Sequence, residues 1–205
     1  MGGATWFEIL NILFRWFHVV FGILWIGLLY FFNFVNANFA KTLDADSKKK
    51  VIPELMPRAL YFFRWAAMFT FVLGLALLYL NYMYMAPGAV NTSASFSDSR
   101  GHWIMFGSTL GTIMWFNVWF IIWPSQRKII NGVKTGSPAA PEIVTRAANA
   151  SKLNVYLSVP LTFSMLAAGN HFLHDEWYWF VGVVVIGYFT ASGLYKRGAK
   201  VTTEV

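Results

Sequence analysis

Five long, uninterrupted apolar runs constrain this chain more than any other feature of its sequence. They cover residues 16–35, 59–85, 103–123, 153–172 and 177–195. A helix needs about 20 apolar residues to cross a hydrocarbon core roughly 30 Å thick. The runs are continuous rather than alternating, and unpaired backbone groups cannot face lipid, so helices are favoured over a β-barrel. The sequence therefore predicts an all-α integral membrane bundle of five transmembrane helices, forming a single domain over residues 1–205.

Composition and the placement of charge agree with this class. Of the 205 residues, 57% are hydrophobic and 12% are charged, which is too apolar for an ordinary soluble domain. The basic residues behind the net charge of +7 gather between the first and second runs, between the third and fourth, and after the fifth. By the positive-inside rule, this pattern predicts an outer N-terminus and a cytoplasmic C-terminus in a bacterial inner membrane. Nucleic-acid binding is not predicted, because no basic stretch carries base-stacking aromatic residues.

The segments around and within the runs add detail. Residues 1–15 predict an interfacial helix or an outer extension of the first span, and they lack the features of a removable signal peptide. Residues 36–58 predict a partly helical surface loop. Gly107 and Gly111 allow a neighbouring backbone to approach closely, and Asn117 needs a hydrogen-bond partner on another helix. Without cysteine, the chain can form no disulfide, thiolate metal site or covalently attached c-type haem.

All four histidines are predicted to lie near the outer membrane surface. Counting about 20 residues outward from the cytoplasmic end of each span gives their depths. His18 falls just inside the outer leaflet, His102 and His171 fall at its edge, and His174 falls just beyond it. The donor and the acceptor of a buried imidazole must both be satisfied, so a histidine within a membrane is a functional candidate by default.

Two of these histidines suit a haem. His18 and His171, on different helices at similar depth, provide the axial ligands that a b-type haem needs. Arg15 lies one helical turn from His18 and suits the haem propionates. We therefore predict a haem b site made by His18, His171 and Arg15, with His102 as a further candidate. In the alternative interpretation, His18 and His171 make structural hydrogen bonds between helices and His102 anchors its helix at the membrane surface.

The turn HFLHDE, residues 171–176, offers a second kind of site. His171 and His174 are three residues apart and Asp175 follows, and imidazole with carboxylate suits copper or zinc. A metal site at His171, His174 and Asp175 is therefore an alternative prediction. The other interpretation is that His174 and Asp175 are solvated residues of a polar connection between two spans.

Three segments of the chain resemble a known family. RWFHVVFGILWIG, FNVWFIIWPSQ and LNVYLSVPLTFSMLAAGNHF are similar to the urate oxidase N-terminal domain, the membrane domain of bacterial membrane-bound urate hydroxylase or dehydrogenase. The resemblance covers three of the five predicted helices and most of residues 15–172. The positions that fall in the shared motifs are Arg15, His18, Trp25, Gly27, Asn117, Pro124, Gln126, Asn154, Pro160, Asn170 and His171.

The resemblance implies an oxidoreductase component and favours His18 with His171 as the central pair. Full-length members carry a C-terminal c-type cytochrome on the outer side, and this sequence has no Cys-x-x-Cys-His, so we do not expect this chain alone to oxidise urate. We predict a subunit that holds haem b and passes electrons to a periplasmic cytochrome c or within a larger membrane complex. The alternatives are a cofactor-free accessory subunit of such a complex and a histidine-based metal-handling membrane protein.

Overall fold

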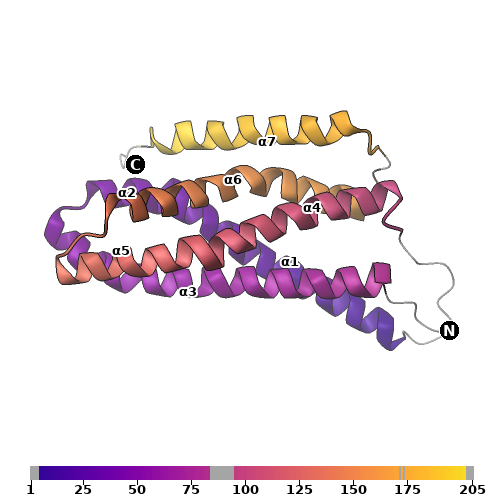
Figure 1. Cartoon of the computed structure of the whole chain (residues 1–205), viewed down its shortest axis with the longest axis horizontal. Helices are drawn as coiled ribbons and strands as arrows, with labels where there is room; N and C mark the ends of the chain where they lie inside the picture. Colours follow the sequence, from indigo (N-terminus) through magenta and orange to yellow (C-terminus); the bar gives the residue numbers. More distant parts are fainter. Residues whose placement is uncertain (1–4, 84–94, 171, 173, 202–205) are drawn as a thin grey trace.

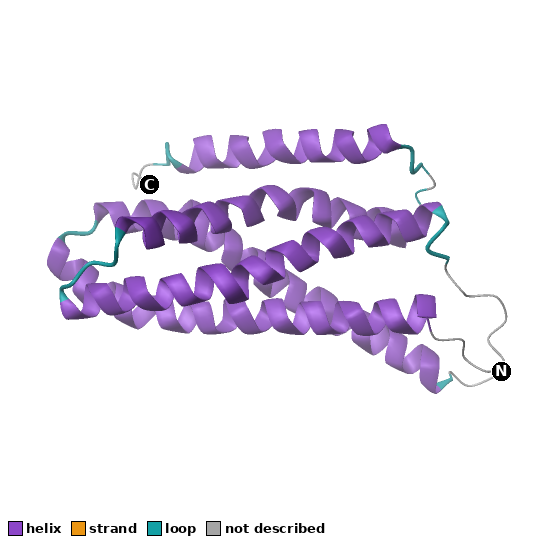
Figure 2. Cartoon of the chain, in the orientation of Figure 1, coloured by secondary structure: helices purple, strands orange, loops and turns teal. Residues whose placement is uncertain are grey.

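The protein is a bundle of long helices. The computed structural model describes residues 5–83, 95–170, 172 and 174–201, and the regular secondary structure within these residues is helical (Figures 1 and 2). The α-helices are α1 (Trp6–Tyr30), α2 (Ala37–Thr42), α3 (Ala45–Leu78), α4 (Ser99–Phe116), α5 (Trp123–Thr135), α6 (Pro141–Gly169) and α7 (Trp177–Gly198). Three π-helical segments are described as well: η1 (Phe31–Asn36), η2 (Tyr79–Met83) and η3 (Asn117–Ile122).

Segment η1 joins α1 to α2, η3 joins α4 to α5, and η2 extends α3. The resulting continuous helices, here called rods, are longer than the apolar runs. Helical structure is continuous over Trp6–Thr42, Ala45–Met83 and Ser99–Thr135. Helix α3 begins where the Asp44 side chain accepts hydrogen bonds from the backbone N–H groups of Asp46 and Ser47, and it continues through Pro53 and Pro57. The segment 36–58 is therefore much more helical than the surface loop that the sequence predicts, because hydropathy marks the part of a helix inside the membrane rather than its ends.

Four of the helical rods are long and apolar enough to cross a membrane: Trp6–Thr42, Ala45–Met83, Ser99–Thr135 and Trp177–Gly198. Helix α6, at 29 residues, is also long enough to cross but is less apolar. Its polar residues Asn154, Ser158 and Ser164 are fully buried, so neighbouring helices cover them. A helix in the centre of a bundle meets protein rather than lipid and does not need an apolar surface all round. The prediction of an all-helical, multi-pass membrane bundle is confirmed.

The helices pack as two pairs with one further helix at the edge. Helix α1 packs mainly on α3, α4 packs on α6, and α7 lies against the far side of α6 (Figure 1). Helix α1 crosses the other helices obliquely, so the two pairs are held together towards one end of the bundle. A large apolar core lies there, and it includes Leu29, Phe63, Met114 and Val155. Between the pairs, towards the opposite end, lies the cavity described below.

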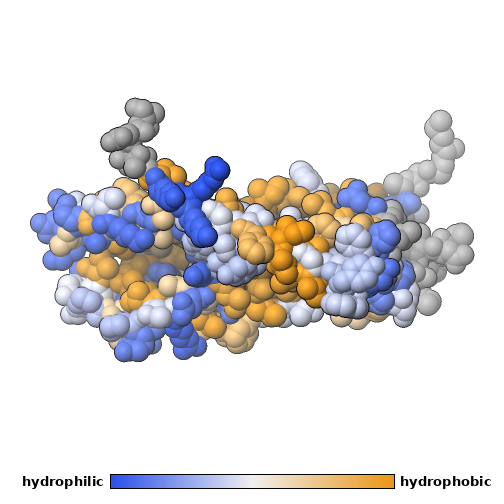
Figure 3. All heavy atoms as spheres, turned by 90° about the horizontal axis from the view of Figure 1, so that it is seen from above, coloured by the Kyte–Doolittle hydropathy of each residue, from blue (hydrophilic) through white to orange (hydrophobic). Residues whose placement is uncertain are grey.

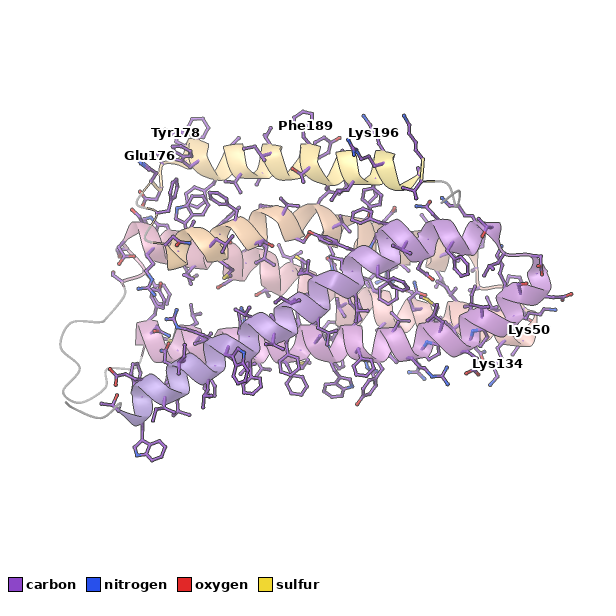
Figure 4. All side chains as sticks on the ribbon, turned by 180° about the vertical axis from the view of Figure 1, so that it is seen from behind. Lys50, Lys134, Glu176, Tyr178, Phe189 and Lys196 are labelled. Atoms are coloured by element: carbon purple, nitrogen blue, oxygen red, sulfur yellow. The ribbon has the colours of Figure 1, made fainter. Side chains whose placement is uncertain are left out.

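The outer surface of the bundle is banded. In Figure 3, hydrophobic residues dominate the middle of the visible face and hydrophilic residues gather towards its ends. Figure 4 shows Lys50, Lys134 and Lys196 towards one end and Glu176 towards the other, while the Phe189 ring points away from the bundle. Phe189 is 68% exposed, as expected for a side chain that faces lipid.

Candidate functional site

A cavity of about 520 Å³ lies between the two helix pairs. Its walls come from α1 and α3 on one side and from α4 and α6 on the other, and they are predominantly apolar. Cofactor and ligand pockets typically have volumes of about 300–1,000 Å³ and a few well-placed polar groups in an apolar lining. This cavity matches that description, and His18 is the imidazole in its lining.

The His18 ring is held by the backbone of α3. Its Nδ1 lies 2.8 Å from the carbonyl oxygen of Thr70. A carbonyl only accepts, so Nδ1 carries the proton and donates it, which leaves the lone pair of a neutral imidazole on Nε2. Among the residues that the structure describes, none forms a hydrogen bond with Nε2. The ring is thus presented as a ligand would be, with one nitrogen fixed and the other available.

Gly74 makes this placement of the ring feasible. A Cβ atom at position 74 would lie 3.0 Å from Cε1 of His18 and 3.4 Å from Nδ1. The absence of a side chain therefore lets the imidazole lie directly against α3, next to the Thr70 carbonyl. Thr70 and Gly74 are four residues apart and share one face of the helix, so together they form the seat of the ring.

Two arginines lie towards the end of the bundle at which α1 and α4 begin. Arg15 precedes His18 by one turn on α1; its Nε donates to Asn11 Oδ1 at 2.5 Å and its Nη2 donates to Asn81 Oδ1 at 3.1 Å. Arg100, near the start of α4, is close enough to Arg15 for the two charges to interact. Its Nε is buried and has no hydrogen-bond partner among the described residues. Two positive charges close together in a partly buried region repel each other, and an anionic group bound near both would relieve that repulsion.

Trp25 is a second residue of the lining that carries a polar atom. It is 2% exposed and follows His18 by seven residues, about two helical turns, on α1. Its indole Nε1 is buried and, within the described part of the chain, has no acceptor. A buried indole N–H normally finds a hydrogen-bond partner. The residues that line the cavity on α1 therefore include His18, whose Nε2 has no hydrogen-bond partner among the described residues, and Trp25, whose buried donor has no acceptor among them.

The other described histidines lie outside this cavity lining. His102 Nδ1 lies 2.5 Å from Asp175 Oδ2, in the connection between α6 and α7, and this hydrogen bond holds the pKa of Asp175 below its usual value. The backbone carbonyl of His174 accepts from Trp103 Nε1 at 2.9 Å, and the His174 ring, which is exposed, packs against Phe172 and Trp179. These contacts hold the N-terminal end of α4 against the α6–α7 connection.

Two predicted sites include a residue that the structure does not describe. His171 lies outside the described residues, so neither its pairing with His18 nor its place in a copper or zinc site is assessed. Among the residues that are described, no three His, Cys, Asp or Glu side chains gather as metal ligands would. His18 and Arg15 remain together on one face of α1, as the sequence predicts.

Sequence reasoning missed Thr70, Gly74 and Arg100. Thr70 and Gly74 are small residues in a long apolar run, and only the partner that packs against them gives them a role. Arg100 could have been noticed in the sequence, since it lies just before the third run, as Arg15 lies just before the first. A charged residue next to a span is common, however, and its position relative to Arg15 depends on how α1 and α4 pack.

Comparison with protein families decides the relationship of the chain. The sequence model described as urate oxidase N-terminal matches residues 4–94 and 85–197. The protein belongs to the urate oxidase N-terminal family. Comparison with curated proteins and with solved structures gave no match. The family therefore rests on nearly the whole chain, and the architecture described above is that of a urate oxidase N-terminal domain.

Two motif residues that carry the resemblance to this urate oxidase N-terminal domain meet in the bundle core. Asn117 Nδ2 donates to Asn154 Oδ1 at 2.8 Å, and Asn154 Nδ2 donates to the carbonyl of Met114 at 3.0 Å. The predicted interhelical partner of Asn117 is thus confirmed as Asn154. The Met114 carbonyl precedes η3, where the hydrogen-bond pattern of the helix changes and a backbone acceptor is accessible to a side chain.

Gly107 explains how α4 and α6 of this urate oxidase N-terminal domain approach each other. A Cβ at position 107 would lie 2.3 Å from Ser164 Oγ and 2.6 Å from Met165 Cε. The small residue therefore allows α6 to pack close to the backbone of α4, as predicted from the spacing of Gly107 and Gly111. Both glycines also line the cavity, so the contact that brings the pair together forms its second wall.

Proposed function

We propose that this chain is a membrane subunit that holds a b-type haem in the cavity at His18 and transfers electrons within, or to, an oxidoreductase complex. The observation that carries the proposal is the fixed His18 ring, whose Nδ1 donates to the Thr70 carbonyl at 2.8 Å while Nε2 has no partner in the described residues. Metal-ligating histidines are held in this manner by a hydrogen bond from the second ring nitrogen. His18 lines an apolar cavity of about 520 Å³.

The charged groups support the same proposal. Haem carries two propionates, and arginine is the residue best suited to bind carboxylates. Arg15 and Arg100 lie at the outer end of the bundle, beyond the His18 end of the cavity. Among the described residues, neither the buried Nε of Arg100 nor the buried indole N–H of Trp25, a residue of the cavity lining, has a hydrogen-bond acceptor. These donors would orient the group and neutralise its charges, while His18 would ligate the iron.

The division of work between protein and cofactor follows from these placements. A bound haem supplies a one-electron couple. The protein would set the potential of that couple through ligation by His18, the apolar walls and the nearby positive charges of Arg15 and Arg100, and the apolar walls would exclude water. We further propose that the chain lies in a bacterial inner membrane with this end outward, where a periplasmic cytochrome c or a larger respiratory complex would exchange electrons with it.

The test is the visible spectrum of the protein purified in mild detergent. We expect a reducible Soret band with a sharp α band. His18→Ala should lose the haem, whereas His102→Ala, a histidine outside the cavity lining, should keep it. A colourless wild-type protein, or a His18→Ala variant with an unchanged spectrum, would contradict the proposal. Colourless protein that co-purifies with a larger enzyme would instead support a cofactor-free accessory subunit.

A further inference from the structure

We infer that Met165, on α6, is the second axial ligand of the haem, opposite His18. This inference rests on the proposed function and names the protein group that would complete the coordination of the iron. The sequence predicts His171 as the second ligand, but His171 lies outside the described residues. Met165 is the candidate that the described residues offer. The inference depends on three observations about the walls of the cavity.

The first observation is that the two walls carry one ligand candidate each. His18 belongs to the wall made by α1 and α3, where its ring lies against Gly74. Met165 belongs to the wall made by α4 and α6, where its terminal methyl group lies beside Gly107. Both side chains and both glycines line the same cavity. A planar macrocycle placed between the helix pairs would therefore have His18 on one side and Met165 on the other.

The second observation concerns the chemistry of the remaining lining. Iron in haem proteins is ligated by histidine, methionine, cysteine or tyrosine side chains. Within the described lining, His18, Met165 and Tyr30 are the side chains of these types. The Tyr30 hydroxyl is already hydrogen-bonded to Ser158 Oγ at 2.8 Å, so it is held away from that role. Met165 is then the group left to face His18.

The third observation is the space around the Met165 tip. A methionine side chain is unbranched and adaptable, and its position here depends on the missing side chain of Gly107. A Cβ at position 107 would come within 2.6 Å of Met165 Cε. Gly107 thus leaves room for Met165 and for its neighbour Ser164, and Gly74 leaves room for His18.

Methionine ligation has a definite consequence for electron transfer. A histidine–methionine haem has a higher reduction potential than a bis-histidine haem, because the neutral thioether stabilises the reduced iron. The protein would therefore accept electrons from its donor at a high potential and deliver them to a high-potential acceptor. This consequence concerns the same site as the proposed function, but it is measured separately.

The experiment compares wild-type protein with Met165→Leu, Met165→His and the control Met105→Leu. Leucine conserves volume and removes the sulfur, and Met105 is a methionine of α4 that is 44% exposed on the outside of the bundle. The readouts are the long-wavelength charge-transfer band of sulfur-ligated ferric haem, followed by magnetic circular dichroism, and the reduction potential. Met165→His guards against misfolding, because it should restore six-coordinate, low-spin haem.

We expect the wild type and Met105→Leu to show the sulfur band, and Met165→Leu to lose it while keeping the Soret band. The potential should fall in Met165→Leu and in Met165→His. A sulfur band that is absent from the wild type, or retained in Met165→Leu, would overturn the inference, as would loss of the second ligand in His171→Ala. A wild type without any Soret band would overturn the proposed function itself, so the two failures are distinguishable.

Discussion

The seat of the His18 ring leads to a prediction in which adding one methyl group weakens haem binding. In Gly74→Ala, the new Cβ would lie 3.0 Å from His18 Cε1, and an ordinary contact begins at 3.4 Å, so the ring has to move by roughly 0.4 Å. Movement away from α3 stretches the 2.8 Å bond between Nδ1 and the Thr70 carbonyl towards the limit of hydrogen-bond geometry. The ring then loses the contact that fixes its tautomer and orientation.

The size of the effect follows from the value of that bond. A hydrogen bond of this kind contributes about 0.5–1.5 kcal/mol, which corresponds to a two- to thirteen-fold change in an equilibrium constant at about 1.4 kcal/mol per tenfold. Loss of an orienting partner typically weakens metal binding by about 10–100-fold, so we expect a decrease in haem affinity near the tenfold overlap of these ranges. A general loss of stability is not the expected cause, because alanine favours a helix over glycine by about 1 kcal/mol.

The assay is titration of haem into the apoprotein in detergent, followed at the Soret maximum. Gly193→Ala is the matched control: Gly193 lies within helix α7, outside the cavity lining, and a Cβ there would meet no atom within 4 Å. It should bind haem as the wild type does. Equal affinities of Gly74→Ala and Gly193→Ala would refute the reasoning, since a Cβ has room at Gly193 and meets the His18 ring at Gly74.

Three further predictions concern the arginine, the buried amides and the outer connection. Arg100→Gln should lower the reduction potential of the bound haem, because removal of a nearby positive charge favours ferric iron; an unchanged potential in a redox titration would place Arg100 away from the haem. Asn154→Leu should lower the free energy of unfolding by about 1–3 kcal/mol. It removes two hydrogen bonds, each worth about 0.6 kcal/mol on average and about 1.7 kcal/mol at most, and it leaves Asn117 unpaired. Unfolding in mixed micelles measures this free energy, and a value equal to that of the wild type would contradict the prediction. The pKa of Asp175 is lowered in the folded protein by its bond with His102, so its contribution to stability is complete above its ordinary value of 3.8 and disappears as the pH falls through the lowered pKa. The wild type should therefore be more stable than Asp175→Asn at neutral pH, and the difference in melting temperature should shrink below about pH 4; a difference that does not change with pH would argue against this bond.

Hydropathy and charge alone predicted the fold class, because lipid permits few ways of satisfying a backbone. The ends of the helices were not predictable in the same way. Helix α3 begins at Ala45 rather than near residue 59, since a helix continues into water wherever its caps allow. Helix α6 is less apolar than the other spans, and only its central position explains why Asn154 is tolerated there.

The candidate site was predictable only in part. His18 and Arg15 are three residues apart on one helix, so their common face follows from helix geometry. Gly74 lies more than 50 residues away along the chain, and its role depends on the crossing of α1 and α3. The position of His102 was similarly underdetermined: its depth near the outer surface was predicted, but its hydrogen bond with Asp175 requires knowledge of how the α6–α7 connection folds back.

A π segment allows the number of residues in a helical rod to change by one without rotating the side chains on either side of it around the helix axis. A π turn closes through a hydrogen bond one residue longer than that of an α-helix, so it accommodates an extra residue locally. Deletion of one residue within Phe31–Asn36 would let η1 close as ordinary α-helix, while the side chains before and after it keep their phase around the bundle. Relatives that differ by a single residue in these segments would then retain the same cavity walls, and an alignment gap placed there would carry no change of architecture.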